Sequence, residues 1–239
     1  MALPIIEAPK YSAKIPSTGK TVQYRPYLVK EEKILMIAME SEDQKQILQA
    51  IKDIVKSCTF DKVDPDKLCT FDLEYLFLKL RSKSVGEVSK VGLKCEKCEK
   101  PTTVDINLDE VTVKTDNLPS NKIKLTETIG VTLAWPRMKI INQLEDSAKD
   151  QNKLNGVMDI VMSCIDSIYD DKKVYPADEQ TREELVQFLD SLNQAQFAKI
   201  QEFIEKMPKL QHTVEFDCGN KDCKHHNTLT IEGLASFFG

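Results

Sequence analysis

The segments Cys95-Glu-Lys-Cys98 and Cys218-Gly-Asn-Lys-Asp-Cys223 each place two cysteines at a short polar turn. Residues of β-strand character flank both turns: Val91-Gly-Leu93 and Thr103-Val-Asp-Ile106 around the first, Thr213-Val-Glu-Phe216 and Asn227-Thr-Leu-Thr-Ile231 around the second. Two runs of this kind on either side of a tight turn are typical of a β-hairpin. The sequence therefore predicts two hairpins, each with a cysteine pair at its turn.

Two such cysteine pairs have the spacing of half-sites for one tetrahedral zinc ion. We predict one structural zinc per chain, held by the four sulfurs of Cys95, Cys98, Cys218 and Cys223. Because protein ligands would fill the coordination shell, no position remains for water or substrate. The metal is therefore expected to stabilise the fold without taking part in chemistry.

Alternatives to a shared zinc site remain open at the level of sequence. Cys98 and Cys218 are 120 positions apart, which is a longer gap than ordinary zinc fingers have. The two pairs could instead stay reduced and independent, form a disulfide, or be buried as small apolar residues. His225 or His226 could also replace one sulfur ligand. Three further cysteines have no partner at ligand spacing and are expected in or near the core: Cys58, Cys69 and Cys164.

The composition indicates a soluble globular protein with a sizeable core. Of the 239 residues 41% are hydrophobic, and no apolar run resembles an export signal or reaches the length of a membrane span. Seven cysteines, an odd number, fit a reducing compartment. A net charge of −5 argues against nucleic acid as the main partner. Lysines near the cysteines would offset the negative charge of a four-thiolate zinc: Lys90, Lys94, Lys97, Lys100, Lys221 and Lys224.

The order of predicted elements divides the chain into five parts. They are an extended N-terminal arm (1–30), a helical block (31–90), the first zinc knuckle (91–110), an inserted hairpin and helical block (111–210), and the second zinc knuckle with an apolar C-terminal segment (211–239). The predicted fold class is α+β, with helical bundle blocks, a two-knuckle zinc-ribbon-like β element and an additional β-hairpin. A zinc ion shared by the knuckles would also fix the two ends of the insertion.

Hydrophobic periodicity predicts helices in both blocks. In the first block they span about 30–40, 42–58 and 70–83, and the first is so apolar that we expect burial on most sides. In the second block, strands at 122–126 and 129–135 form a hairpin. Helices then follow from about 137, at 153–169, after a capping box at Thr181-Arg-Glu-Glu184, and at 194–207.

The C-terminal segment Leu234-Ala-Ser-Phe-Phe238 is apolar but too short to form a stable helix alone. We expect it to dock on the body or on a neighbouring molecule. Our hypothesis from sequence is that this segment and the N-terminal arm hold the chain to partner proteins or to another copy of itself.

No arrangement of residues indicates catalysis, so we predict that the protein is not an enzyme and has no catalytic residues. Ser17-Thr-Gly-Lys-Thr21 ends like a phosphate-binding loop, but Lys14 occupies the position of the required earlier glycine. The three histidines all lie beside the second cysteine pair. Paired carboxylates fall at turns and helix starts, where they are expected to be solvated or to cap helices.

Two segments carry a resemblance to a known family. Tyr24-Arg-Pro-Tyr-Leu-Val-Lys-Glu-Glu-Lys-Ile-Leu-Met-Ile-Ala-Met-Glu-Ser41 and Asp72-Leu-Glu-Tyr-Leu-Phe-Leu-Lys-Leu-Arg-Ser-Lys-Ser-Val-Gly86 resemble the baseplate hub subunit family of T-even-like contractile-tailed bacteriophages. The likeness is strongest over about residues 15 to 100. It implies a structural protein of the virion tail, made and assembled in the host cytoplasm, that contacts other hub or tail proteins or another copy of itself.

Two other roles are also considered. An assembly chaperone for hub or tape-measure protein, absent from the mature virion, would need similar apolar patches. A zinc-ribbon protein that associates with nucleic acid would need a basic groove with aromatic residues for stacking. The acidic balance and an aromatic content of 7% argue against this last role, and no contact with a membrane is expected.

Overall fold

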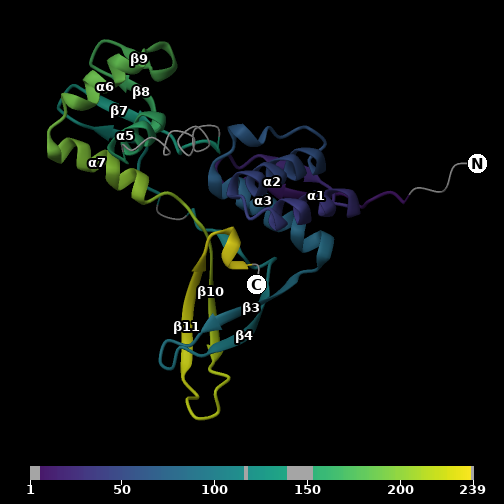
Figure 1. The fold of residues 1–239 in the computed structure, drawn as a ribbon. Helices are drawn as coiled ribbons and strands as arrows, with labels where there is room; N and C mark the ends of the chain where they lie inside the picture. Colours follow the sequence, from purple (N-terminus) through teal and green to yellow (C-terminus); the bar gives the residue numbers. More distant parts are fainter. Residues whose placement is uncertain (1–5, 116–117, 139–152, 238–239) are drawn as a thin grey trace, which may run out of the picture. The chain divides into compact units, whose positions relative to one another are not determined.

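The structure is a computed structural model of the chain, and it describes residues 6–115, 118–138 and 153–237. The chain forms two compact units: unit 1 comprises Met1–Lys114 with Lys209–Gly239, and unit 2 comprises Thr115–Pro208. Each unit combines helices with small antiparallel sheets (Figure 1), which confirms the predicted α+β class. The finer division into five parts stays a prediction. Among the described residues, every helix is too short or too polar to cross a bilayer.

Unit 1 begins with a block of three helices. They are α1 (Val29–Glu40), α2 (Gln44–Cys58) and α3 (Thr70–Val85), with a 3-10 turn η1 (Pro65–Lys67) between the last two. The predicted apolar stripes of α2 and α3 are buried at Ile51, Ile54, Val55 and Cys58 and at Leu73, Leu76, Phe77 and Leu80. Helical periodicity therefore predicted both packed faces correctly.

The segment expected to be an extended arm is largely folded. β1 (Tyr11–Lys14) and β2 (Thr21–Tyr24) pair as an antiparallel hairpin. Its turn is held on α3, because the buried carboxylate of Asp72 accepts hydrogen bonds from the backbone N–H and the hydroxyl of Ser17. Tyr24 and Tyr27 are buried as well. Proline content indicated an open chain, but these tyrosines and the Ser17 contact attach residues 11–27 to unit 1.

The expected burial of α1 on most sides is wrong. Only Glu31 and Ala38 are buried in this helix. Ile37 is 67% exposed and Val29 is 66% exposed, and the other apolar side chains on this face, Ile34, Met36 and Met39, are exposed too. The carboxylate of Glu31 faces the protein instead, where it accepts a hydrogen bond of 2.8 Å from Arg25. Apolar composition alone did not reveal which face packs.

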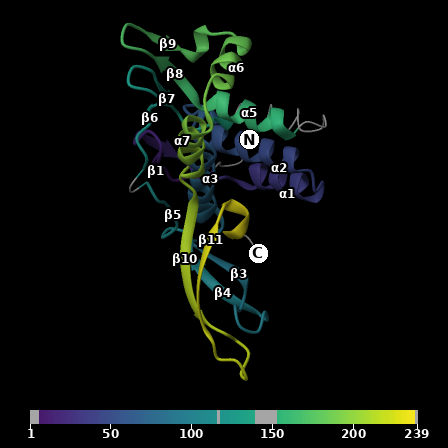
Figure 2. The ribbon, with the colours of Figure 1, turned by 90° about the vertical axis from the view of Figure 1, so that its left-hand side faces the viewer.

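Two β-hairpins form the rest of unit 1, at the two predicted positions. β3 (Val88–Lys94) pairs with β4 (Pro101–Asn107), and β10 (Leu210–Asp217) pairs with β11 (His226–Glu232) and with β5 (Thr112–Val113). Their inward side chains meet in one buried cluster with Leu78 of α3 and with Phe237 of the 3-10 turn η3 (Leu234–Phe237). Figures 1 and 2 show the two hairpins side by side, with the turn of β3–β4 against the far end of β10–β11.

Unit 2 is inserted between β5 and β10, and the ends of the insertion meet in that strand pair. Leu210 pairs with Val113, and Gln211 pairs with Thr112. The cysteines lie beyond the opposite end of β10, which has eight residues and is therefore about 25 Å long. The β5–β10 pair already joins the ends of the insertion, so a shared zinc would not be the only link between them.

The core of unit 2 lies between one antiparallel sheet and three helices. The strand order is β6 (Lys122–Lys124), β7 (Gly130–Leu133), β8 (Ile165–Tyr169) and β9 (Val174–Pro176). The helices are α5 (Lys153–Cys164), α6 (Arg182–Asp190) and α7 (Gln194–Glu205), with a 3-10 turn η2 (Ala177–Glu179) before α6. The predicted hairpin and the capping box at Thr181 are both present. The helix expected from about residue 137 falls mainly on residues 139–152, outside the described residues.

The helix predicted at 153–169 is too long. α5 ends at Cys164, and β8 continues directly from it. Ile168 pairs with Val131 of β7 and with Tyr175 of β9, so β8 is a central strand. The β-branched and aromatic residues of Ile165-Asp-Ser-Ile-Tyr169 suit such a position, and pairing on both sides overrides the helical period.

Candidate metal centre

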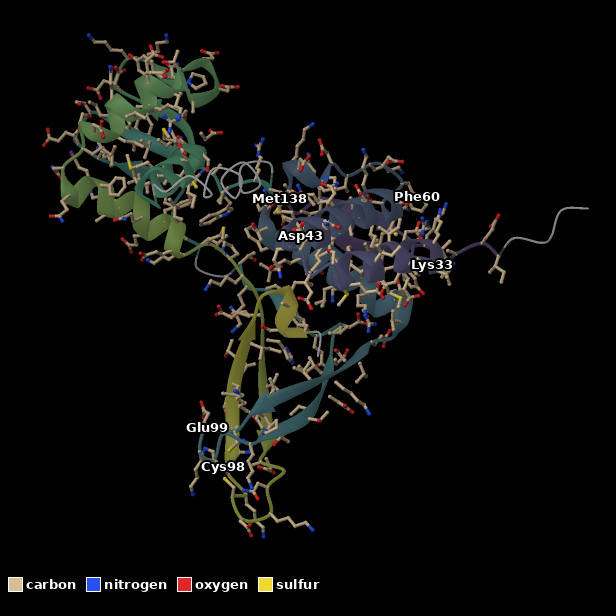
Figure 3. The ribbon with its side chains drawn as sticks, in the orientation of Figure 1. Lys33, Asp43, Phe60, Cys98, Glu99 and Met138 are labelled. Carbon is tan, nitrogen blue, oxygen red and sulfur yellow. The ribbon has the colours of Figure 1, made fainter. Side chains whose placement is uncertain are left out.

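The four cysteines of the two hairpin turns come together in space. Their sulfur atoms all lie within 4.8 Å of one another. The Sγ atoms of Cys95 and Cys223 are 3.9 Å apart, and those of Cys98 and Cys218 are 3.5 Å apart. Each of these close contacts joins one hairpin to the other. Figure 3 shows Cys98 at the turn of β3–β4, against β10–β11.

Backbone hydrogen bonds shape each turn around its own sulfurs. In the first turn, Cys95 donates its N–H to the carbonyl of Lys100 at 3.1 Å, and Glu99 donates to the carbonyl of Cys95 at 2.9 Å. In the second turn, Cys218 donates to His225 at 2.8 Å, and Cys223 donates to Asn220 at 2.9 Å. The chain folds back at both places, so both cysteines of each pair lie on the inner side of their turn.

Asn227 links the two turns beside the sulfurs. It is fully buried, and its Oδ1 accepts a hydrogen bond of 2.9 Å from the backbone N–H of Glu96 in the other hairpin. Its Nδ2 donates to the carbonyl of His225 at 3.0 Å. A second link runs from the N–H of Gly219 to the hydroxyl of Thr102, at 3.0 Å. These contacts fix how the two cysteine pairs face each other, as outer hydrogen bonds commonly do around metal ligands.

The sequence interpretation missed Asn227 and Thr102. A signal for Asn227 was present: it occupies an inward position of β11, in line with Leu229 and Ile231, where a polar side chain needs a buried partner. That partner belongs to the other hairpin, so the sequence around Asn227 did not reveal it. Thr102 gave no comparable signal, because threonine is an ordinary strand residue.

The ionisation of the four thiols differs between the hairpins. Burial opposes ionisation of Cys95, but N–H groups of Cys98 and Lys97 lower its pKa to about 6. An N–H of Lys100 lowers the pKa of Cys98. In the second turn, the N–H of Asn220 favours the Cys218 thiolate, but burial and the neighbouring sulfurs raise the pKa of Cys218 to about 11. Burial also raises the pKa of Cys223. Four thiolates this close therefore require a compensating cation.

The arrangement fits a zinc ion. A tetrahedral site with Zn–S bonds of about 2.3 Å has sulfurs about 3.8 Å apart, and the two close distances, 3.5 and 3.9 Å, lie on either side of this value. Among the described residues, neither His225 nor His226 belongs to the cluster. His226 instead lies beside Asp217, with Nδ1 2.9 Å from Oδ1. The four sulfurs alone therefore supply the ligand set that a closed structural site needs.

The surroundings of the cluster carry both signs of charge. The six lysines noted in the sequence are exposed, but exposed acidic residues are interspersed among them, at Glu96, Glu99, Asp105, Asp217 and Asp222. The lysines can offset the charge of a four-thiolate metal, whereas such mixed charge does not form the basic surface that nucleic acid requires.

The other predicted sites are separate from this cluster. Cys58, Cys69 and Cys164 are buried, as expected. Burial raises the pKa of the Cys58 and Cys164 thiols to about 11 each. In the Ser17–Thr21 segment, the first four residues lie in the turn between β1 and β2 and Thr21 begins β2, whereas α1 begins only at Val29. It therefore lacks the helix start that a phosphate-binding loop places beside its ligand.

Each cysteine turn contains a strained residue directly after its second cysteine. Glu99 has φ of 58° and Lys224 has φ of 45°, the left-handed region that glycine adopts most easily. We predict that Glu99→Gly stabilises unit 1 by roughly 0.5–1 kcal/mol, because relief of strain exceeds the entropic cost of glycine. Thermal unfolding of the zinc-loaded protein would measure the change.

A matched control lies in the same turn. Glu96 is also exposed but has no positive φ, so Glu96→Gly should destabilise by roughly 0.5–1 kcal/mol. Equal destabilisation by both glycines would show that the left-handed conformation of Glu99 costs nothing.

Comparison with known proteins gives a family for almost the whole chain. Residues 8–239 match the family described as T4 bacteriophage base plate protein. No curated protein and no solved structure matches the chain. A baseplate protein belongs to the phage tail and assembles with other tail proteins. This agrees with the tail location and the tail-protein partners that the sequence led us to expect. Since the match covers both units, the chain belongs to the T4 bacteriophage base plate protein family.

Proposed function

We propose that this chain is a non-enzymatic structural subunit of the baseplate hub, with one structural zinc held by Cys95, Cys98, Cys218 and Cys223. Membership of the baseplate family supports the location in the tail. The cluster of four sulfurs from two hairpins supports the metal. The bound ion would cross-link the hairpins and leave no position free for a substrate.

The observation that supports a structural role most directly is the position of the cluster. It lies at the ends of two hairpins whose inward side chains already share one buried core. A metal there adds a second fixed point about one strand length from the β5–β10 pair. The two hairpins would then keep one orientation while the protein is held by its neighbours in the baseplate.

The content of purified tails tests this function. Quantitative mass spectrometry should find the chain at a constant ratio to the other central baseplate proteins, both in mature tails and in baseplates that have not yet acquired a tube. Cross-linking should join it to the central baseplate proteins and leave peripheral ones unlinked. Presence in assembly intermediates but absence from mature tails would instead show a chaperone. Absence from both would reject the proposed function.

A further inference from the structure

The outer face of α1 is an apolar surface that the chain itself leaves uncovered. Its centre is formed by Met36 and Ile37, which are 56% and 67% exposed. Val29, Ile34 and Met39 extend it along the helix, and all three are exposed. Isolated apolar side chains are common on protein surfaces, but five exposed on one helix of 12 residues are more than scattered residues would give, and such a concentration marks an interaction site.

Exposed charges stand at both ends of this patch, with opposite signs. Lys30 and Lys33 lie in the N-terminal half of α1, and Glu40 and Glu42 lie at its C-terminal end. A helical residue advances 100° around the axis, so Lys33, Met36, Ile37 and Glu40 all project within one sector of about 100°. The apolar centre and one charge of each sign therefore occupy the same outward strip.

This strip is complementary to itself. If two copies pack their α1 helices antiparallel, with Met36 opposite Ile37, then Lys33 of each copy falls opposite Glu40 of the other. In the same register, Glu32 falls opposite the uncharged Ser41. A parallel pairing would instead place Lys33 beside Lys33 and Glu40 beside Glu40, which like-charge repulsion disfavours. A two-fold axis perpendicular to the helices generates this antiparallel pairing, in which both copies use the same surface.

We propose that the α1 strip is the interface of a two-fold symmetric dimer of this chain. The unbranched side chains of Met36 and Met39 can adjust to each other across the contact. The helix is about 18 Å long, so it alone covers less than the roughly 800 Å² per partner of a standard interface. The dimer should therefore depend on concentration and should be favoured where copies are held close together, as in an assembled particle.

Sedimentation of the full chain, with a mass of 27.2 kDa, tests the proposal through a charge exchange. The wild type should shift from monomer to dimer with rising concentration. Lys33→Glu and Glu40→Lys should each weaken the dimer at least tenfold, because each places like charges opposite one another. The double variant Lys33→Glu/Glu40→Lys should recover the wild-type dissociation constant, because the swapped charges pair again.

An apolar substitution gives a second, independent measurement. Ile37→Asp should weaken the dimer at least tenfold, whereas Val174→Asp, at an apolar residue of unit 2 with 56% exposure, should leave it unchanged. Circular dichroism should show native helix content for every variant, since these side chains are exposed. A monomer at all concentrations, or a double variant as weak as the single ones, would overturn the proposal. If Ile37→Asp blocks incorporation into tails while the wild type is monomeric, the strip binds another tail protein instead.

Discussion

Replacing Cys98 and Cys223 together by serine is expected to remove zinc from the protein and to separate the ends of the two hairpins. These residues supply one sulfur from each turn, so the remaining pair, Cys95 and Cys218, offers only half of a closed shell. Structural zinc contributes roughly 10–16 kcal/mol in small zinc-finger peptides. The loss here should be smaller, several kcal/mol, because the buried cluster between the sheets also holds the hairpins.

Elemental analysis and thermal unfolding would measure this effect. Wild-type protein purified without added metal should contain about one zinc per chain, and the double variant should contain less than a tenth of that. Cys58→Ser is the control, since Cys58 is fully buried away from the cluster: it should lower stability but keep the zinc. A double variant with full zinc content would contradict the assigned ligands.

The structure also predicts which parts of the chain stay folded after zinc is lost. Because the β5–β10 pair joins the ends of unit 2, loss of zinc should leave the sheet of unit 2 protected from amide hydrogen exchange. Protection should fall instead at the turn ends of β3, β4, β10 and β11. Simultaneous loss of protection at Val131 and Ile168, which pair within unit 2, would show that the insertion depends on the metal after all.

The parts of this fold that the sequence predicted are those that depend on local signals. Ligand spacing and flanking strand residues identified both cysteine hairpins, and helical period identified the packed faces of α2 and α3. The clustering of the four cysteines was predicted from the same signals, because two hairpin turns with paired cysteines suit one shared tetrahedral ion. The link through Asn227 did not follow, since its partner, the N–H of Glu96, belongs to the other hairpin.

The errors have one physical origin, which is contact between distant segments. The helical spacing of apolar residues in α5 continues into Ile165 and Ile168, but these two residues belong to β8, which pairs with β7 and β9. The apolar run of α1 indicated burial, yet its buried positions are Glu31 and Ala38, and Arg25 pairs with the glutamate. In each case the local preference was predicted correctly, and contact with a distant segment decided the outcome.

The C-terminal segment shows the same effect with the largest consequence for interpretation. From sequence we expected Leu234–Phe238 to dock on the body or on a neighbouring molecule, and our hypothesis favoured partner proteins. Phe237 is instead fully buried in the cluster of unit 1. Its backbone carbonyl accepts a hydrogen bond of 2.7 Å from the hydroxyl of Ser89 on β3. The N–H of Leu234 approaches Glu74 of α3 at 3.4 Å. Phe237 is therefore a component of the core, and these contacts hold the described part of the segment on unit 1.

Phe237→Ala is accordingly expected to destabilise unit 1 by about 3–5 kcal/mol, the usual cost of removing a buried phenyl ring. Chemical denaturation of the full chain would show it as a lower midpoint. Ser236→Ala is the matched control one residue earlier: Ser236 is half-buried and its hydroxyl donates to the carbonyl of Glu232 in the same turn, so the change should cost at most about 1 kcal/mol. The result separates the two interpretations of this segment. A Phe237→Ala protein that keeps wild-type stability but fails to join tails would restore the segment as a partner contact. A protein that loses stability, and joins tails again once cooled below its unfolding transition, would show that Phe237 acts by holding η3 between α3 and the two hairpins.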